Sequence, residues 1–345
     1  MERTKIGLAL SGGGIRAAIF HLGVMAYLAR AGLFGKIAGI SSVSGASLCI
    51  GAIFAANNNR WPTAAEFTNE ILPRVRLLIL KENIQRAAII RLPFHPKMWR
   101  KRVNLIAKML EKKWGINGNL QDLPSFPFWE INCTTFETGS RFRFRRDYMG
   151  DQRIGYVQNP TLPVSHMIAA SAAFPVLIGP YVLETEGLCF GKVKRKPAPL
   201  RHCGIAQESH ACLDILDKYT LWDGGVYDNL GLDALHKIGT GLDDEINFLI
   251  VSNAGASVGE KSRGRPSQNL RRLLDISSAQ IEMLRTRDFF SSVVKKGKGL
   301  YIKIGKNPEN NLARNYPTTL NSPSAKDFDE IFQNGYQSME CAIGG

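Results

Sequence analysis

Short apolar runs alternate with longer amphipathic stretches from the beginning of the chain. The runs at 5–10 and 37–43 are each followed by a stretch with the 3.6-residue period of a helix, at 15–31 and 46–56. Strands that alternate with helices in this way indicate βαβ units and a parallel sheet. A buried central strand is predicted at 246–252, which contains a continuous apolar run. We therefore predict an α/β fold, a three-layer α/β/α sandwich with a mostly parallel central sheet.

The rest of the chain also alternates between short apolar runs and stretches with a helical period, and it has no internal repeat. We expect further strands at 129–136, 140–146 and 299–304, and further helices at 64–92, 97–114, 163–172, 230–238, 267–288 and 324–340. These elements fit a single domain over residues 1–345. Two elaborations are expected within it, a basic helical insertion at about 64–125 and a loop-rich excursion at about 185–218. Residues 255–266 are predicted to form a surface loop.

The positive charge of the chain is concentrated in the helical insertion. The 345 residues carry a net charge of +14, and the segment from Arg74 to Lys113 holds twelve basic residues against two acidic ones. Large apolar side chains, including Trp99 and Trp114, lie between these charges. Basic and apolar residues mixed in this way suit the surface of an anionic phospholipid membrane. The alternative is a solvated helical face with ordinary core contacts. No nucleic-acid-binding motif accompanies the segment.

The sequence shows no sign of secretion, of a membrane span or of a metal site. The first strand begins near Lys5, which leaves no room for a signal peptide, and no apolar run approaches the ~18 residues of a membrane span. We therefore expect a soluble, cytoplasmic protein that associates peripherally with membranes. Cys203, His210 and Cys212 lie close together, but their spacing matches no zinc-ligand pattern. The six cysteines are expected to be reduced.

A first glycine-rich turn lies between a predicted strand and a long helix. The sequence Ser11-Gly12-Gly13-Gly14 allows close approach of a ligand to the backbone, and N–H groups at a helix start attract negative charge. Gly12-x-Gly14-x-x-Ala17 formally fits a dinucleotide fingerprint, but no acidic residue occurs between Glu2 and Glu66 to bind a ribose. The other interpretation is an oxyanion hole for acyl transfer, which requires a nucleophile near the same sheet edge.

The next strand-to-helix turn supplies that nucleophile. In GISSVSGAS, residues 39–47, Ser44 stands at the sharp corner with Gly45 behind it, as in a nucleophile elbow. Ser41 and Ser42 are assigned to the strand end, and Ser47 to the first helical turn. The G-x-S-x-G consensus is not met, but the small side chains at the flanking positions permit tight packing.

A serine hydroxyl needs a base, which must come from a distant part of the chain. The histidine candidates are His21, His166 and His236. The other candidate is Asp223 in LWDGGVYDNLG, residues 221–231, where two glycines after the aspartate force a tight turn and present the carboxylate at an edge. Asp228 is expected to cap the helix that begins near Leu230.

Three motifs, in this order, resemble those of patatin-like phospholipases: GGGIR at 12–16, SVSGAS at 42–47 and DGGVYDNLG at 223–231. The small-residue segment Ala169–Pro175 is similar to one that the family places between the last two. The resemblance implies a serine–aspartate dyad, with Ser44 attacking the ester and Asp223 as its base. It also implies hydrolysis of phospholipids, lysophospholipids or neutral lipids with neither metal nor cofactor. The oxyanion hole and its support would be formed by Gly12, Gly13, Gly14, Gly45 and Arg16.

Two features depart from the family pattern. Ser42 replaces the first glycine of the elbow, which is closer to cytosolic phospholipases A2 and bacterial patatins than to plant patatin. The excursion before Asp223 is longer than expected for the family.

Two alternative functions stay open at this point. One is an acyltransferase related to malonyl-CoA acyl-carrier-protein transacylases. The other is a catalytically silent membrane-binding or signalling module.

Overall fold

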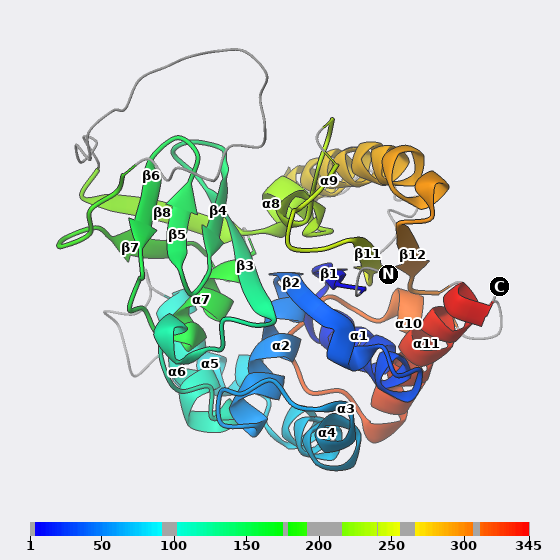
Figure 1. The fold of residues 1–345 in the computed structure, drawn as a ribbon. Coiled ribbons are helices and arrows are strands. Elements are labelled where there is room, and N and C mark those ends of the chain that lie inside the picture. Colours follow the sequence, from blue (N-terminus) through cyan, green and yellow to red (C-terminus); the bar gives the residue numbers. More distant parts are fainter. Residues whose placement is uncertain are drawn as a thin grey trace.

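The computed structural model describes residues 4–91, 102–174, 179–191, 216–239, 241–255, 266–305 and 311–344. At its centre five parallel strands lie side by side (Figure 1). Their order across the sheet is β12 (Gly299–Lys303), β11 (Phe248–Asn253), β1 (Ile6–Leu10), β2 (Ile37–Val43) and β3 (Phe128–Thr135). Every residue of β1, β2 and β3 is buried, as expected for parallel strands covered on both faces.

An antiparallel extension continues the sheet beyond β3. It consists of β4 (Arg141–Phe144), β5 (Tyr148–Asp151) and β6 (Gly155–Gln158). A separate pair, β7 (Tyr181–Glu184) and β8 (Lys218–Asp223), joins the sheet through the contact of β8 with β3. Of these five strands only β4, and the end of β8 near Asp223, were expected from the sequence. Strands β5, β6 and β7 have four residues each and were not expected from the sequence.

Helices cover both faces of the sheet, which confirms the predicted sandwich. In Figure 1, α1 (Gly14–Arg30), α2 (Gly45–Ala56) and α11 (Ala325–Gly344) lie below the parallel strands, and α8 (Gly225–Asp228) and α9 (Pro266–Ser292) lie above them. The larger apolar core joins the sheet to the lower helices and to α6 (Arg102–Trp114) and α7 (Val164–Ser171). A smaller core, containing Phe289 of α9, lies on the other face. Other short helical segments include the 3-10 turns Phe34–Lys36, Leu120–Asp122 and Val294–Lys296, and α10 (Asn311–Asn315).

The helical insertion is less regular than the sequence predicts. The single helix expected at 64–92 consists of α3 (Ala64–Glu66), a π-helical turn (Phe67–Ile71), α4 (Leu72–Lys81) and α5 (Ile84–Arg91). The break occurs because Glu82 is extended and the Asn83 side chain caps α5, accepting the N–H of Arg86 at 2.8 Å. Lys97, Arg100 and Lys101 of the predicted basic segment lie outside the described residues, as do His95 and Trp99.

Two other expectations are wrong. The helix predicted at 230–238 is replaced by a 3-10 turn, Leu232–Ala234, and by β9 (His236–Lys237), which pairs with β10 (Gly241–Leu242). Left-handed Gly231, with φ of 65°, prevents a continuous helix there.

Cys189 is disulfide-bonded, so not all cysteines are reduced. Spacing in sequence does not reveal which cysteines a long excursion brings together. Cys49, Cys133 and Cys341 are free, whereas His202, Cys203, His210 and Cys212 lie outside the described residues.

Within the described ranges, no helix combines the length and the apolar character that crossing a bilayer requires.

Candidate active site

Ser44 and Asp223 meet because two strands lie end to end along one edge of β3. Strand β2 pairs with the first part of β3, so that Val43 lies opposite Asn132. Strand β8 pairs with the last part, where Asp223 lies opposite Cys133. Because β4 occupies the other edge of β3, β8 follows on directly from β2 and runs toward it. The residue after β2 and the last residue of β8 therefore come together.

The corner at Ser44 has the strained geometry of a nucleophile elbow. Its φ and ψ are 52° and −114°, and α2 begins at the next residue. This conformation is unfavourable for a residue with a side chain, and such strain is concentrated at functional sites. The tight turn is possible because Gly45 has no side chain. A Cβ there would lie 1.9 Å from the carbonyl oxygen of Gly14, so the two glycine-rich turns contact each other through their backbones.

The carboxylate of Asp223 lies within hydrogen-bonding reach of the Ser44 hydroxyl, which lowers its pKa. Its Oδ1 also accepts the N–H of Gly225 at 2.7 Å, which holds the side chain in place. Asp223 is 3% exposed, and this burial raises its pKa from 3.8 to about 6, although both hydrogen bonds oppose the increase. A carboxylate with such a pKa, in contact with a serine hydroxyl, has the properties of a general base near neutral pH.

The glycine turn presents backbone N–H groups at the start of α1. Gly13 and Gly14 have φ of 147° and 64°, which only glycine adopts readily. The N–H of Gly12 donates to the Asn229 carbonyl and is engaged, and Gly12 therefore shapes the turn without offering a donor. Neither α1 nor α2 has a capping side chain or an acidic residue in its first turn. The N–H groups of Gly13, Gly14 and Gly45 have no hydrogen-bond partner within the described ranges, and their helix ends attract an anion.

Arg16 holds the glycine turn against the C-terminal part of the chain. Its buried guanidinium donates to the carbonyls of Ala254, at 3.1 Å, and Tyr316. One of its nitrogens also lies close to Gly13. Burial lowers the pKa of Arg16 to about 10, and the carbonyl contacts satisfy a charge that has no acidic partner in the described part of the chain. Its position fits the supporting role that the resemblance implies.

A family model for patatin-like phospholipases matches residues 8–236, more than half of the chain, and the matched range contains all the site residues above. The chain belongs to the patatin-like phospholipase family. Membership supports lipid hydrolysis as the general activity. Among curated protein sequences, none is significantly similar to this chain.

Two solved structures of larger proteins are similar to this patatin-like phospholipase. Human GIVD cytosolic phospholipase A2 superposes with a TM-score of 0.55 at 11% identity, covering 99% of this chain and 60% of its own. VipD from Legionella pneumophila gives a TM-score of 0.44 at 15% identity, covering 99% of this chain and 67% of its own. The first likeness supports the shared fold, and the chain spans about 60% of the length of that phospholipase.

Ser171 supports the elbow in a way that the sequence did not reveal. The Ser44 backbone N–H donates to the Ser171 hydroxyl at 3.0 Å, and that hydroxyl donates to the Asn132 carbonyl at 2.8 Å. The small-residue segment was expected from the family pattern, but its role was not. Only the register of α7 against β3 shows which of its residues reaches the elbow.

The other serines of GISSVSGAS belong to the buried network beneath the elbow. Ser42 and Ser47 share a hydrogen bond of 2.9 Å, and Trp129 donates to Ser42 at 2.8 Å. Ser41 donates to the Gly231 carbonyl at 2.6 Å. All three are fully buried, so each is held away from any substrate.

The three histidine candidates make their hydrogen bonds away from Ser44. His21 is fully buried between Ser252 and the Ser11 carbonyl, each at 2.9 Å, and burial lowers its pKa to about 4. His166 contacts the Tyr181 hydroxyl at 3.3 Å, and His236 pairs with Asp288 at 2.7 Å.

We expect His166→Ala and His236→Ala to retain most of the ester hydrolysis of this patatin-like phospholipase, because neither ring contacts the serine–aspartate pair. The test is kcat/KM on a soluble ester, with thermal melting to confirm folding. A loss of more than about 10²-fold in a folded variant would instead indicate a histidine that acts as the base.

Gly45→Ala should lose several kcal/mol of stability, because the new Cβ meets backbone that cannot move aside. Gly35→Ala is the matched control, since a Cβ there has nothing within 4 Å. Urea denaturation of both variants measures the difference. Equal stabilities would show that the two turns do not touch as described.

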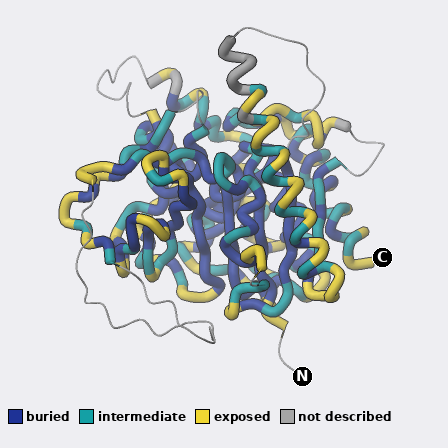
Figure 2. Tube along the Cα trace, turned by 90° about the horizontal axis from the view of Figure 1, so that it is seen from above, coloured by how far each residue is buried: buried dark blue, intermediate teal, exposed yellow. Residues whose placement is uncertain are grey.

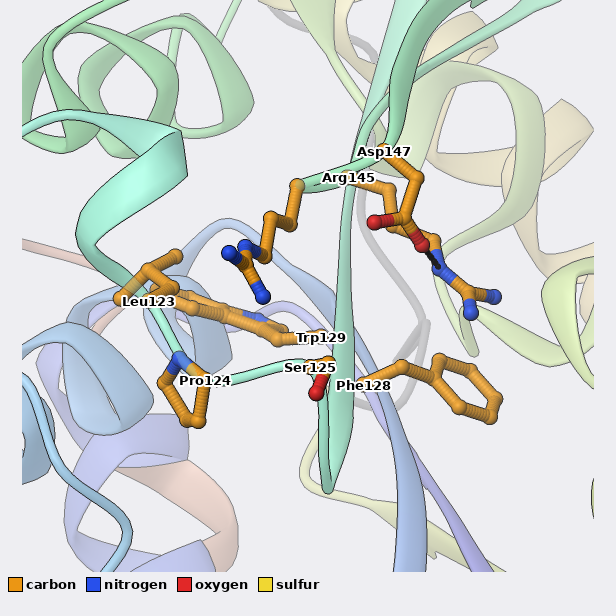
Figure 3. Close-up of a pocket in the computed structure, with 8 residues that line it drawn as sticks. Leu123, Pro124, Ser125, Phe128, Trp129, Arg145 and Asp147 are labelled. Atoms are coloured by element: carbon orange, nitrogen blue, oxygen red, sulfur yellow. Dashed lines mark ion pairs between the residues drawn. The ribbon is translucent and has the colours of Figure 1, made fainter. Parts of the chain in front are cut away.

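A hollow between the turn before β3 and the end of β4 is not part of this site (Figure 3). Phe128, Trp129, Arg145 and Asp147 are among the residues that line it. Phe128 begins β3, so the hollow lies at the amino-terminal edge of the sheet, opposite the edge that carries Ser44. Its position gives it no role in chemistry at Ser44.

Proposed function

We propose that this patatin-like phospholipase hydrolyses the carboxylic esters of membrane lipids, of the phospholipase A or lysophospholipase type. Ser44 is the nucleophile and Asp223 its general base in this proposal. The observation that carries it is the proximity of the two side chains at a strained elbow, next to uncapped helix ends.

The first half-reaction transfers the acyl group to the enzyme. Asp223 takes the proton from the Ser44 hydroxyl as its oxygen attacks the ester carbonyl carbon. The carbonyl oxygen becomes an oxyanion, which the N–H groups of Gly13, Gly14 and Gly45 stabilise. One such donor is typically worth about 10²–10³ in rate. Collapse of the intermediate breaks the ester C–O bond, and the leaving alcohol takes the proton from Asp223.

The second half-reaction releases the fatty acid. Asp223 now removes a proton from water, whose oxygen attacks the acyl carbon. The bond to Ser44 breaks, and the serine oxygen takes the proton back from Asp223. The same carboxyl group therefore serves as base and acid in turn, and no histidine, metal or cofactor takes part in the steps proposed here.

We also propose that the basic helical insertion brings the enzyme to anionic membrane surfaces as a peripheral protein. Its helix α5 begins near the Ser44 edge of the sheet. Gln85 accepts hydrogen bonds from the side chain of Thr319 and the N–H of Leu320, both at 2.8 Å, and Thr319 packs against Gly14. Part of the positive charge is neutralised within the protein by the pairs Arg74–Glu70, Arg76–Asp329 and Lys113–Glu82. The remainder supports attraction to anionic lipid.

The proposal is tested by incubating the purified protein with mixed phospholipid vesicles and identifying the products by mass spectrometry. The expected result is release of free fatty acid by the wild type and none by Ser44→Ala. Labelling of Ser44 by a fluorophosphonate without any release of fatty acid would contradict a lipid substrate. Absence of both labelling and release would favour the catalytically silent module.

A further inference from the structure

In the described part of the chain, the long helix α9 contacts the sheet through its C-terminal half. Phe289 is fully buried and reaches Gly299, the first residue of β12. Two turns earlier, Glu282 accepts a hydrogen bond from Asn253 at 2.6 Å and pairs with Lys303, the last residue of β12, at 3.6 Å. The helix therefore runs antiparallel to the parallel strands, from their carboxyl ends back to their amino ends.

The N-terminal half of α9 continues past the carboxyl edge of the sheet. Residues 266–281 precede Glu282, and at 1.5 Å per residue they extend about 24 Å. Ser44 follows the carboxyl end of β2 and therefore lies at the same edge. No position between 272 and 281 whose burial is described is buried. Where Figure 2 colours this helix by burial, most of it is exposed or intermediate.

The outer face of α9 carries a stripe of exposed apolar side chains. These are Leu273 (62% exposed), Ile276 (40%), Met283 (38%), Leu284 (60%) and Phe290 (40%). At 100° per residue they fall within about 120° of arc, on the side of the helix opposite Phe289 and Glu282. Large exposed apolar side chains gathered on one helix face mark an interaction surface.

Positive charge lies beside this stripe. Arg287 is exposed on the same side of the helix. In the sequence, the segment 256–273, which includes the first residues of the helix, has five basic residues and one acidic residue. An apolar helix face with flanking arginine is complementary to an anionic lipid surface, which attracts basic residues.

We propose that the outer face of α9 is a docking surface for anionic membranes, with Leu273 and Ile276 among the residues that enter the lipid headgroup region. This inference rests on the proposed lipid hydrolase function. The free half of the helix extends from the Ser44 edge, so docking through it holds that edge close to the bilayer that contains the substrate. The helix thus adds an apolar anchor to the electrostatic attraction of the basic insertion.

The test is flotation of the full chain with vesicles of phosphatidylcholine and phosphatidylglycerol. Leu273→Asp/Ile276→Asp should bind about tenfold more weakly or worse, because two apolar side chains that are buried on docking are replaced by charges that anionic lipid repels. Ile238→Asp is the matched control. Ile238 is 61% exposed but lies beyond His236, which pairs with Asp288 near the amino edge of the sheet. This variant should bind as the wild type does.

Equal flotation of the double variant and the wild type would overturn the inference. So would a change in oligomeric state of the double variant with vesicle binding retained, because the stripe would then cover a second copy of the chain. Hydrolysis of a water-soluble short-chain ester, which needs no surface, separates this outcome from failure of the proposed function. If the wild type floats but hydrolyses no ester, docking stands and the catalytic proposal fails.

Discussion

Ser44→Ala should lower kcat for ester hydrolysis by about 10⁴-fold or more, because the variant has no oxygen that can form the acyl-enzyme. The protein should remain folded. Alanine adopts the strained φ of 52° at about the same cost as serine, and the Ser44 backbone N–H keeps its bond to Ser171. The measurement is steady-state hydrolysis of a soluble ester, combined with thermal melting of both proteins.

Ser47→Ala provides the matched control three residues later. Its hydroxyl contacts Ser42 and Ser171, both of which keep other hydrogen-bond partners in the variant. We expect a stability loss of about 1–2 kcal/mol and activity within a few-fold of the wild type. If Ser47→Ala and Ser44→Ala lost activity equally while folded, the assignment of Ser44 as the nucleophile would fail.

Asp223→Asn should also abolish hydrolysis, since an amide cannot take the proton of Ser44. In the wild type the base must be deprotonated, so kcat/KM should rise with pH and reach half of its maximum near pH 6, the pKa to which burial raises this carboxyl. Any residual activity of the variant should not show this rise of kcat/KM near pH 6. A wild-type profile that stays flat from pH 4 to pH 8 would contradict Asp223 as the base.

The same variant should be more stable than the wild type at neutral pH. The pKa of Asp223 is about 6 in the folded protein, and 3.8 is its ordinary value, taken for the unfolded chain. Between these two pH values the folded protein therefore binds one proton that the unfolded chain has released. Stability of the wild type is therefore expected to fall as pH rises from about 4 to about 6. A shift of this size corresponds to a few kcal/mol at pH 7. Thermal melting at pH 4 and pH 8 measures it, and Asp223→Asn should lack that decline.

Local patterns in the sequence predicted the framework of the fold. The sequence identified the strand at 37–43 and the helices around 15–31 and 46–56. Each of these elements has a clear hydrophobic period, and a glycine-rich turn precedes each of the two helices. The helix expected at 230–238 was wrong because Gly231 is left-handed and Asp228 accepts the N–H groups of Leu230 and Asp233. Helical periodicity gives no sign of such local competition for backbone hydrogen bonds.

The geometry of the site depends on contacts between distant residues. The motifs identified Ser44 and Asp223 as candidates, but only the pairing of β2 and β8 with one edge of β3 shows how they meet. Two hydrogen bonds likewise join segments far apart in the chain. The Gly12 N–H donates to the Asn229 carbonyl, and the Ser44 N–H donates to the Ser171 hydroxyl. Periodicity and residue type contain no information on register of this kind.

The most direct test of a Ser44 nucleophile activated by Asp223 is covalent labelling by a fluorophosphonate, followed by mass spectrometry of the intact protein and its peptides. The account predicts one adduct on the wild type, located at Ser44, and labelling of Asp223→Asn that is slower by orders of magnitude. An adduct on another serine, or equally fast labelling of folded Asp223→Asn, would contradict it.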